Sequence, residues 1–117
     1  DVSGLRSPDV TFWVAWDGDA PMGCGALKAL GGAHGEVKSM RTPEARRRTG
    51  AGRALLMHII EVAHQRGYEQ LSLETGSMAG FAPAHQLYAS AGFVDTGPFG
   101  SYVADPNSRF MTLRLRP

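Results

Sequence analysis

A short glycine-rich stretch before an amphipathic segment constrains the fold of this chain more than any other feature. Gly50 and Gly52 directly precede a segment in which Leu55 and Ile59 recur at helical spacing, and several arginines lie within residues 46–53. The glycines and arginines therefore stand at the N-terminus of a predicted helix. Free backbone NH groups, the helix dipole and nearby cations all favour an anion at such a position, so the stretch predicts a phosphate or pyrophosphate site.

Two well-known phosphate loops do not fit this stretch. No Gly-Lys-Ser/Thr sequence follows, which excludes a Walker loop, and Ala54-Leu55 after Gly52 breaks the dinucleotide-binding Gly-x-Gly-x-x-Gly pattern. The local pattern alone also fits a glycine-rich helix start beside solvated arginines, so the wider sequence has to decide between the two interpretations.

The other segments predict strands and one more helix. Alternating, β-branched and aromatic residues predict strands at 10–16, 22–30, 36–41, 71–75, 93–94 and 110–115, with a turn at 17–19 and a flexible break at 31–35. Gly67 is expected to end the first helix, and Pro83 and Gly92 to begin and end a second. The order of elements favours an α/β, or α+β, mixed sheet with helices packed on it.

Size and composition favour one domain spanning residues 1–117. The chain has 117 residues, 43% of them hydrophobic, a formal charge of +1 and one cysteine, Cys24. Two domains would each be too small to bury a core, and a single cysteine forms no internal disulfide. No segment resembles a signal peptide or reaches the ~18 apolar residues of a membrane span. We therefore expect a soluble cytoplasmic protein that binds neither metal nor membrane.

Two motifs resemble those of the GNAT superfamily of acyl-CoA-dependent N-acetyltransferases. Residues 47–52 match the signature Arg/Gln-x-x-Gly-x-Gly/Ala, although Arg48 stands where many members have glycine, and residues 87–93 match Leu-Tyr-x-x-x-Gly-Phe. The resemblance runs from about Trp13 to Leu115. It implies a GNAT fold, a mixed, mostly antiparallel sheet with splayed central parallel strands and flanking helices.

The resemblance also implies that the usual N-terminal strand and helices are missing. Residues 10–16 would then expose an apolar edge, and a homodimer is one way to cover it.

The resemblance implies acetyl-CoA as cosubstrate and a set of residues that hold it. The strand before the glycine-rich loop would bind the pantetheine arm, and loop amides and arginines would bind the pyrophosphate. The residues concerned are Met40, Arg41, Thr42, Arg47, Arg48, Thr49, Gly50, Ala51, Gly52 and Arg53.

Candidate catalytic and acceptor-binding residues follow from the same resemblance. Tyr88, at the tyrosine of the second motif, is the expected general acid, since a pKa of about 10 keeps it protonated at neutral pH. Glu36 lies four residues before Met40, so strand alternation predicts that both point to one face, and Glu36 is the expected base, acting directly or through water. Glu74 competes for that role. Tyr102 and Asp105, with Glu74, are candidates for binding a cationic acceptor.

The predicted function is transfer of an acetyl group from acetyl-CoA directly to a primary amine of a small molecule or peptide. The alternative is a non-catalytic acyl-CoA-binding or regulatory module with the same loop. Nucleic-acid binding through the arginines is disfavoured because the chain is nearly neutral and lacks an aromatic-basic stripe.

Overall fold

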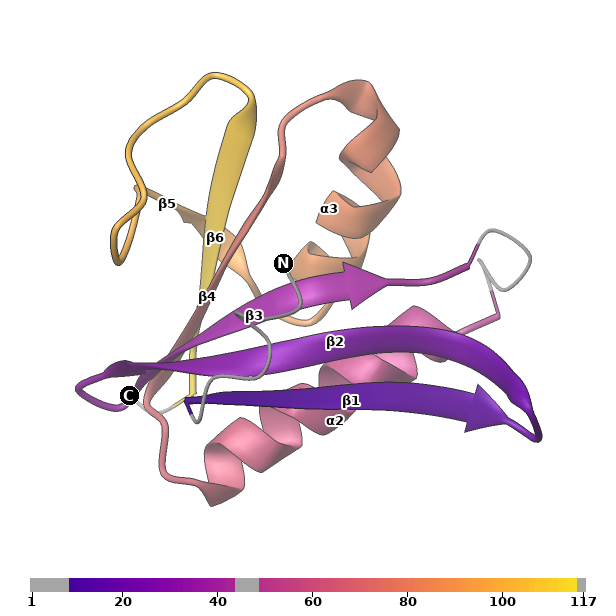
Figure 1. The fold of residues 1–117 in the computed structure, drawn as a ribbon. Helices are drawn as coiled ribbons and strands as arrows, with labels where there is room; N and C mark the ends of the chain where they lie inside the picture. The colour runs from indigo at the N-terminus through magenta and orange to yellow at the C-terminus, as the bar shows by residue number, and fades with distance from the viewer. Residues whose placement is uncertain (1–8, 44–48, 116–117) are drawn as a thin grey trace.

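A six-stranded mixed sheet with two helices forms the molecule, in a computed structural model that describes residues 9–43 and 49–115. The elements follow one another in the predicted order (Figure 1): β1 (Val10–Asp17), β2 (Ala20–Gly31), β3 (His34–Arg41), α2 (Ala51–Gln65), β4 (Gln70–Gly76), a 3₁₀ turn η2 (Ala79–Phe81), α3 (Ala82–Ser90), β5 (Val94–Thr96) and β6 (Ser108–Arg114). The expected fold class is confirmed, and η2 is an element that the sequence did not indicate.

The two central strands are parallel and separate soon after they begin. The sheet order is β1-β2-β3-β4-β6-β5, and every neighbouring pair is antiparallel except β3 and β4. That pair is in register only from His34–Gln70 to Glu36–Ser72. Beyond it β4 turns away from β3, and the sheet opens into a V (Figure 1). The backbone of β3 past Glu36 therefore has no partner strand on the side of β4.

A bulge in β3 changes which face its last residues occupy. Between the pairs Cys24–Arg41 and Ala26–Lys38, β3 carries one residue more than β2, and Ser39 has a φ of 56°. The extra residue reverses the alternation, so Met40 packs against the core on the side of the helices. Glu36 lies on the opposite face of the sheet. The expectation that Glu36 and Met40 share a face is wrong for this reason.

The break predicted at residues 31–35 is shorter in the structure. Gly32 and Ala33 both have a φ of 61° and form a two-residue turn, so His34 pairs with Gly31 and begins β3. The predicted strand at 93–94 is also displaced, because Phe93 is buried against Tyr88 and β5 begins at Val94.

The core lies between the sheet and the helices. α2 crosses behind β1 and β2 (Figure 1) and contacts β2 and β3, and two glycines of β2 leave room for it. A Cβ atom at Gly25 would lie 2.9 Å from Ile59 Cδ1, so this close approach requires glycine. The core cluster comprises Leu27, Val37, Leu55, Leu56, Ile59, Ala63, Leu71, Leu73, Tyr88, Phe93 and Met111.

The outer strand β1 presents apolar side chains to solvent, as the sequence led us to expect. Phe12 is 42% exposed and Trp16 61% exposed, and both lie on the face of β1 turned away from α2. Among the described strands, β1 pairs with β2 alone. No helix within residues 9–43 and 49–115 is long and apolar enough to cross a membrane.

Candidate active site

A pocket of about 440 Å³ occupies the gap between the diverging strands. One wall comes from the end of β3, another from the end of β4, and a third from η2 and α3. Its lining comprises Val37, Ser39, Met40, Arg41, Glu74, Thr75, Gly76, Phe81, Ala84 and Tyr88. The pocket therefore brings together four of the residues predicted from sequence: Met40, Arg41, Glu74 and Tyr88.

The N-terminus of α2 has the features expected of an anion site. Gly50 is the N-cap residue with a φ of 87°, and the first turn contains no acidic residue. Glycine itself supplies no side-chain cap to the NH groups of Ala51, Gly52 and Arg53. A Cβ atom at Gly52 would lie 3.3 Å from Thr42 Oγ1, so glycine allows the end of β3 and the helix to approach closely. Thr49 is exposed at the turn before Gly50.

Arg53 connects the two helices. Its Nη1 donates to Ser90 Oγ at 2.9 Å, and Ser90 Oγ donates to the carbonyl oxygen of Leu87 at 2.7 Å. The N-terminus of α2 is thereby joined to the last turn of α3, next to Tyr88. Arg47 and Arg48, predicted to bind pyrophosphate, lie outside the described residues.

Tyr88 is buried beside the pocket. Its side chain is 7% exposed, and its ring packs edge-on against Phe93 with centroids 5.9 Å apart. Burial raises the pKa of the phenol above its ordinary value. The Tyr88 hydroxyl has no hydrogen-bond partner among the described residues, so it is free to bond to a molecule in the pocket.

Glu36 is bonded to Tyr102 on the face of the sheet opposite the helices. The Tyr102 hydroxyl donates to Glu36 Oε2 at 2.6 Å, and the Glu36 side chain is 3% exposed. Burial, followed by the bond to Glu36 and the negative charges of Glu36 and Glu74, raises the pKa of Tyr102. Tyr102 therefore stays a neutral donor at physiological pH. Glu36 does not line the pocket.

Glu74 is exposed and lies at the pocket. Its Oε2 accepts a hydrogen bond of 2.6 Å from the Ser108 hydroxyl at the start of β6. Asp105 is placed elsewhere: its Oδ1 accepts a bond of 2.8 Å from the backbone NH of Asn107, which closes a turn within the loop. The structure thus brings Glu74 to the pocket and leaves Asp105 outside its lining.

A hydroxyl network beside Glu36 was not evident from the sequence. Thr112 donates to the carbonyl of Leu71, so it accepts from Ser72, and Ser72 in turn accepts from His34 Nε2 at 2.7 Å. Burial lowers the pKa of His34, while the negative charge of Glu36 opposes that shift. Its residues come from β3, β4 and β6, so no contiguous pattern in the sequence indicates the network.

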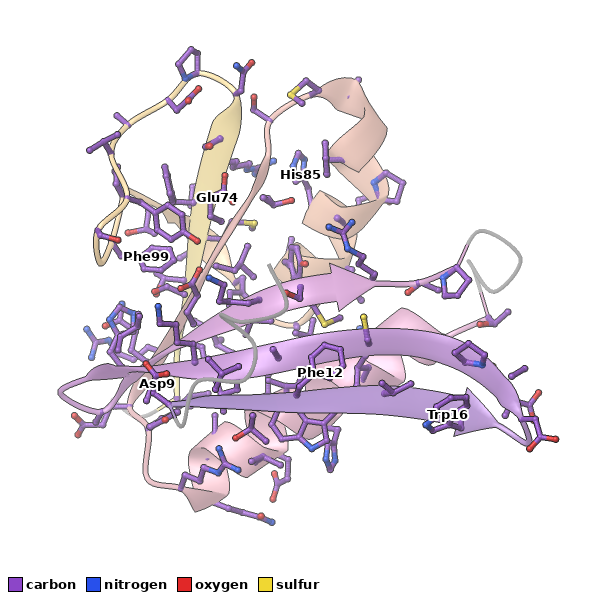
Figure 2. All side chains as sticks on the ribbon, viewed as in Figure 1. Asp9, Phe12, Trp16, Glu74, His85 and Phe99 are labelled. Carbon is purple, nitrogen blue, oxygen red and sulfur yellow. The ribbon has the colours of Figure 1, made fainter. Side chains whose placement is uncertain are left out.

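Two further residues shape the end of β4. The ring of Phe81 packs on Gly76, where no side chain larger than hydrogen fits. His85 Nε2 donates to the carbonyl oxygen of Gly76 at 2.7 Å and fixes this strand end against α3. Figure 2 shows His85 between β4 and α3, and Phe99 on the other side of β4 and β6.

Comparison with known proteins identifies the family. Residues 3–93 match the model of the acetyltransferase (GNAT) family. The N-acetyltransferase YsnE of Bacillus subtilis is 59% identical over 111 residues, which cover 95% of this chain and 74% of YsnE. The N-acetyltransferase YedL of Escherichia coli is 51% identical over 115 residues, covering 98% of this chain and 72% of YedL.

Solved structures agree with this result. An acyl-CoA N-acyltransferase from Klebsiella pneumoniae superposes with a TM-score of 0.88 at 30% identity, covering 98% of this chain and 79% of the other. A Bacillus subtilis acetyltransferase in complex with CoA has the same fold, with a TM-score of 0.80 at 20% identity over 97% of this chain and 82% of its own. The chain therefore belongs to the GNAT family, whose members use acyl-CoA, and it is an N-acetyltransferase.

Proposed function

We propose that this N-acetyltransferase moves the acetyl group of acetyl-CoA directly to a primary amine of a small molecule or peptide. The observation that supports the proposal is the pocket between β3 and β4, because its lining includes both Glu74 and Tyr88, whose hydroxyl has no partner among the described residues. The first turn of α2 lies close to Thr42, which follows the pocket residue Arg41, and a helix N-terminus suits the pyrophosphate of the same molecule.

Different residues near the gap between β3 and β4 would bind different parts of acetyl-CoA. Backbone groups of Met40 to Thr42 would bind the pantetheine arm, since β4 leaves this side of β3 unpaired. The amides from Thr49 to Arg53 would bind the pyrophosphate, with charge-assisted bonds from Arg47 and Arg48. Backbone NH groups of the bulged strand would polarise the thioester carbonyl.

Transfer forms a C–N bond and breaks the C–S bond, so it requires one proton donor and one proton acceptor. Tyr88 would give its phenolic proton to the departing thiolate. The acceptor's proton would go to one of two carboxylates. Glu36 is covered by Tyr102 and reaches an amine only through water or after Tyr102 moves, whereas Glu74 is exposed in the pocket. The geometry therefore supports Glu74 as the carboxylate that contacts the amine. Glu36 would take the amine's proton only through water or after Tyr102 moves.

A calorimetric titration with acetyl-CoA tests the binding site first. In Gly50→Asp, a carboxylate stands at the N-terminus of α2, and we expect acetyl-CoA affinity to fall at least about a hundredfold because the like charge opposes the pyrophosphate. Gly67→Asp is the matched control: Gly67 also has a positive φ, 83°, with open space around it, but lies at the other end of α2. Equal affinities in the two variants would refute the loop assignment.

Release of CoA thiol with a panel of primary amines then tests transfer itself. Tight acetyl-CoA binding together with no thiol release above hydrolysis for any amine would refute the proposed acceptor class.

A further inference from the structure

The loop between β5 and β6, residues 97–107, lies on the face of the sheet opposite the helices and is bonded to β3 at Glu36, the last residue that still pairs with β4. On one side it reaches β3, because Tyr102 donates to Glu36 at 2.6 Å. On the other side it reaches the end of β4, because Ser77 Oγ donates to the carbonyl oxygen of Pro106 at 2.6 Å and the Ser77 NH donates to that of Asn107 at 3.0 Å. The same loop is therefore bonded to both strands that diverge.

Aromatic packing holds the Tyr102 ring in this position. Phe99 lies 5.1 Å from it and Phe110 5.6 Å, measured between ring centroids, and Phe99 also packs against Phe110. Figure 2 shows Phe99 within the loop, facing β6. The three rings form an apolar cover, and the phenol oxygen is the polar atom by which this cover binds the carboxylate of β3.

The loop contacts β3 in two ways: the Phe99 ring lies 5.9 Å from that of His34, and the Tyr102 hydroxyl bonds to one buried carboxylate. Glu36 is 3% exposed and accepts from Tyr102, and no described Lys or Arg forms an ion pair with it. Lys28 stands opposite Glu36 in the β2–β3 register without such a pair. Hydrogen bonds to charged groups are stronger than those between neutral groups, so this contact dominates the attachment of the loop to β3.

We propose that Tyr102 and Glu36 act as a positioning pair that fixes loop 97–107 on the face of the sheet opposite the helices and so orients the Glu74 carboxylate in the pocket. The loop continues directly into Ser108, which donates to Glu74 and carries the effect of the attachment to that carboxylate. In this arrangement Glu36 holds Tyr102 and does not itself contact the acceptor. Only the expected effect of the pair on binding of the amine acceptor rests on the proposed function.

Hydrogen exchange tests the pair without any need for activity. The Tyr102 NH donates to Phe99 within the loop and the Ser108 NH donates to Asp105, so both amides report on loop order. In Tyr102→Phe and in Glu36→Gln we expect these amides to exchange roughly tenfold faster or more, the factor that a lost charge-assisted bond produces. The double variant should exchange no faster than Tyr102→Phe, because without the Tyr102 hydroxyl the residue at position 36 no longer bonds to the loop.

Tyr68→Phe is the control, because Tyr68 packs on the core away from this loop. Unchanged exchange in Tyr102→Phe and Glu36→Gln, or effects that add in the double variant, would overturn the proposal.

Kinetics with 2-phenylethylamine as acceptor give the functional readout. Both variants should raise KM for the amine several-fold, lower kcat less, and leave acetyl-CoA affinity unchanged. A loss confined to kcat in Glu36→Gln would make Glu36 the base and overturn its positioning role. If the wild-type chain binds acetyl-CoA yet releases no thiol, the proposed transfer fails, and the exchange measurements still decide the positioning pair.

Discussion

At the scale of single residues, Tyr88 shows how burial prepares a side chain for acid chemistry. A phenol withdrawn from water has a raised pKa, so it keeps its proton at pH 7 and gives it up only to a strong base such as a thiolate formed next to it. The hydroxyl has no partner among the described residues, so none of them competes for that proton. Burial and an open hydrogen-bonding position together suit Tyr88 to its proposed role.

Tyr88→Phe should therefore lower kcat by about a hundredfold or more, the range seen when a positioned acid is removed. Acetyl-CoA affinity should change little, because the ring and its packing on Phe93 remain. The rate of thiol release and a calorimetric titration measure the two quantities. Tyr68→Phe, which removes a hydroxyl distant from the pocket, should match the wild type. A kcat within twofold of the wild type in Tyr88→Phe would remove the acid assignment.

At the scale of elements, close packing around β3 depends on positions where a side chain does not fit. A Cβ atom at Gly35 would lie 2.9 Å from the ring of Tyr68 and 3.0 Å from both Leu27 and Leu71. The crowding comes from three directions, so no single neighbour can relieve it. Gly35 stands in the short parallel segment from which the V opens, and its packing helps to fix where β3 and β4 separate.

Gly35→Ala should lower the free energy of unfolding by about 1–3 kcal/mol, the usual cost of overpacking a core. Gly97→Ala is the matched control, since a Cβ atom there has nothing within 4 Å and the change should stay within about 0.5 kcal/mol. Urea denaturation followed by circular dichroism measures both. Equal stability of the two variants would contradict the packing seen at Gly35.

At the scale of the whole molecule, the stability of the fold should depend on pH through His34. Burial lowers the pKa of His34 in the folded state. Below about pH 6.5, His34 therefore binds a proton in the unfolded chain more readily than in the folded chain. The stabilising contribution is therefore present above that pH and is lost as the pH falls toward the folded-state pKa. Glu36 reduces the effect but does not reverse it.

Between pH 7 and pH 5, the wild type should lose more free energy of unfolding than His34→Gln, whose amide can still donate to Ser72. Urea denaturation at a series of pH values gives both curves, and their difference isolates His34 from the other titrating groups. A difference that stays constant across this range would show that His34 does not couple folding to pH.

The sequence by itself determined the order of the elements and the start of α2. Both depend on local properties: periodic apolar residues, turn residues, and glycines that permit a positive φ at a helix start. The two motifs, at residues 47–52 and 87–93, also determined the family, because each is a short contiguous pattern. These features need no knowledge of distant contacts.

Only the tertiary structure decided which residues face the pocket. The bulge at Ser39 moves Met40 to the face opposite Glu36, which strict alternation along a strand does not foresee. The bond from Tyr102 to Glu36 joins residues 66 positions apart, and the bond from Ser108 to Glu74 joins residues 34 apart. Such contacts arise from the packing of whole strands and loops, so short sequence patterns do not predict them.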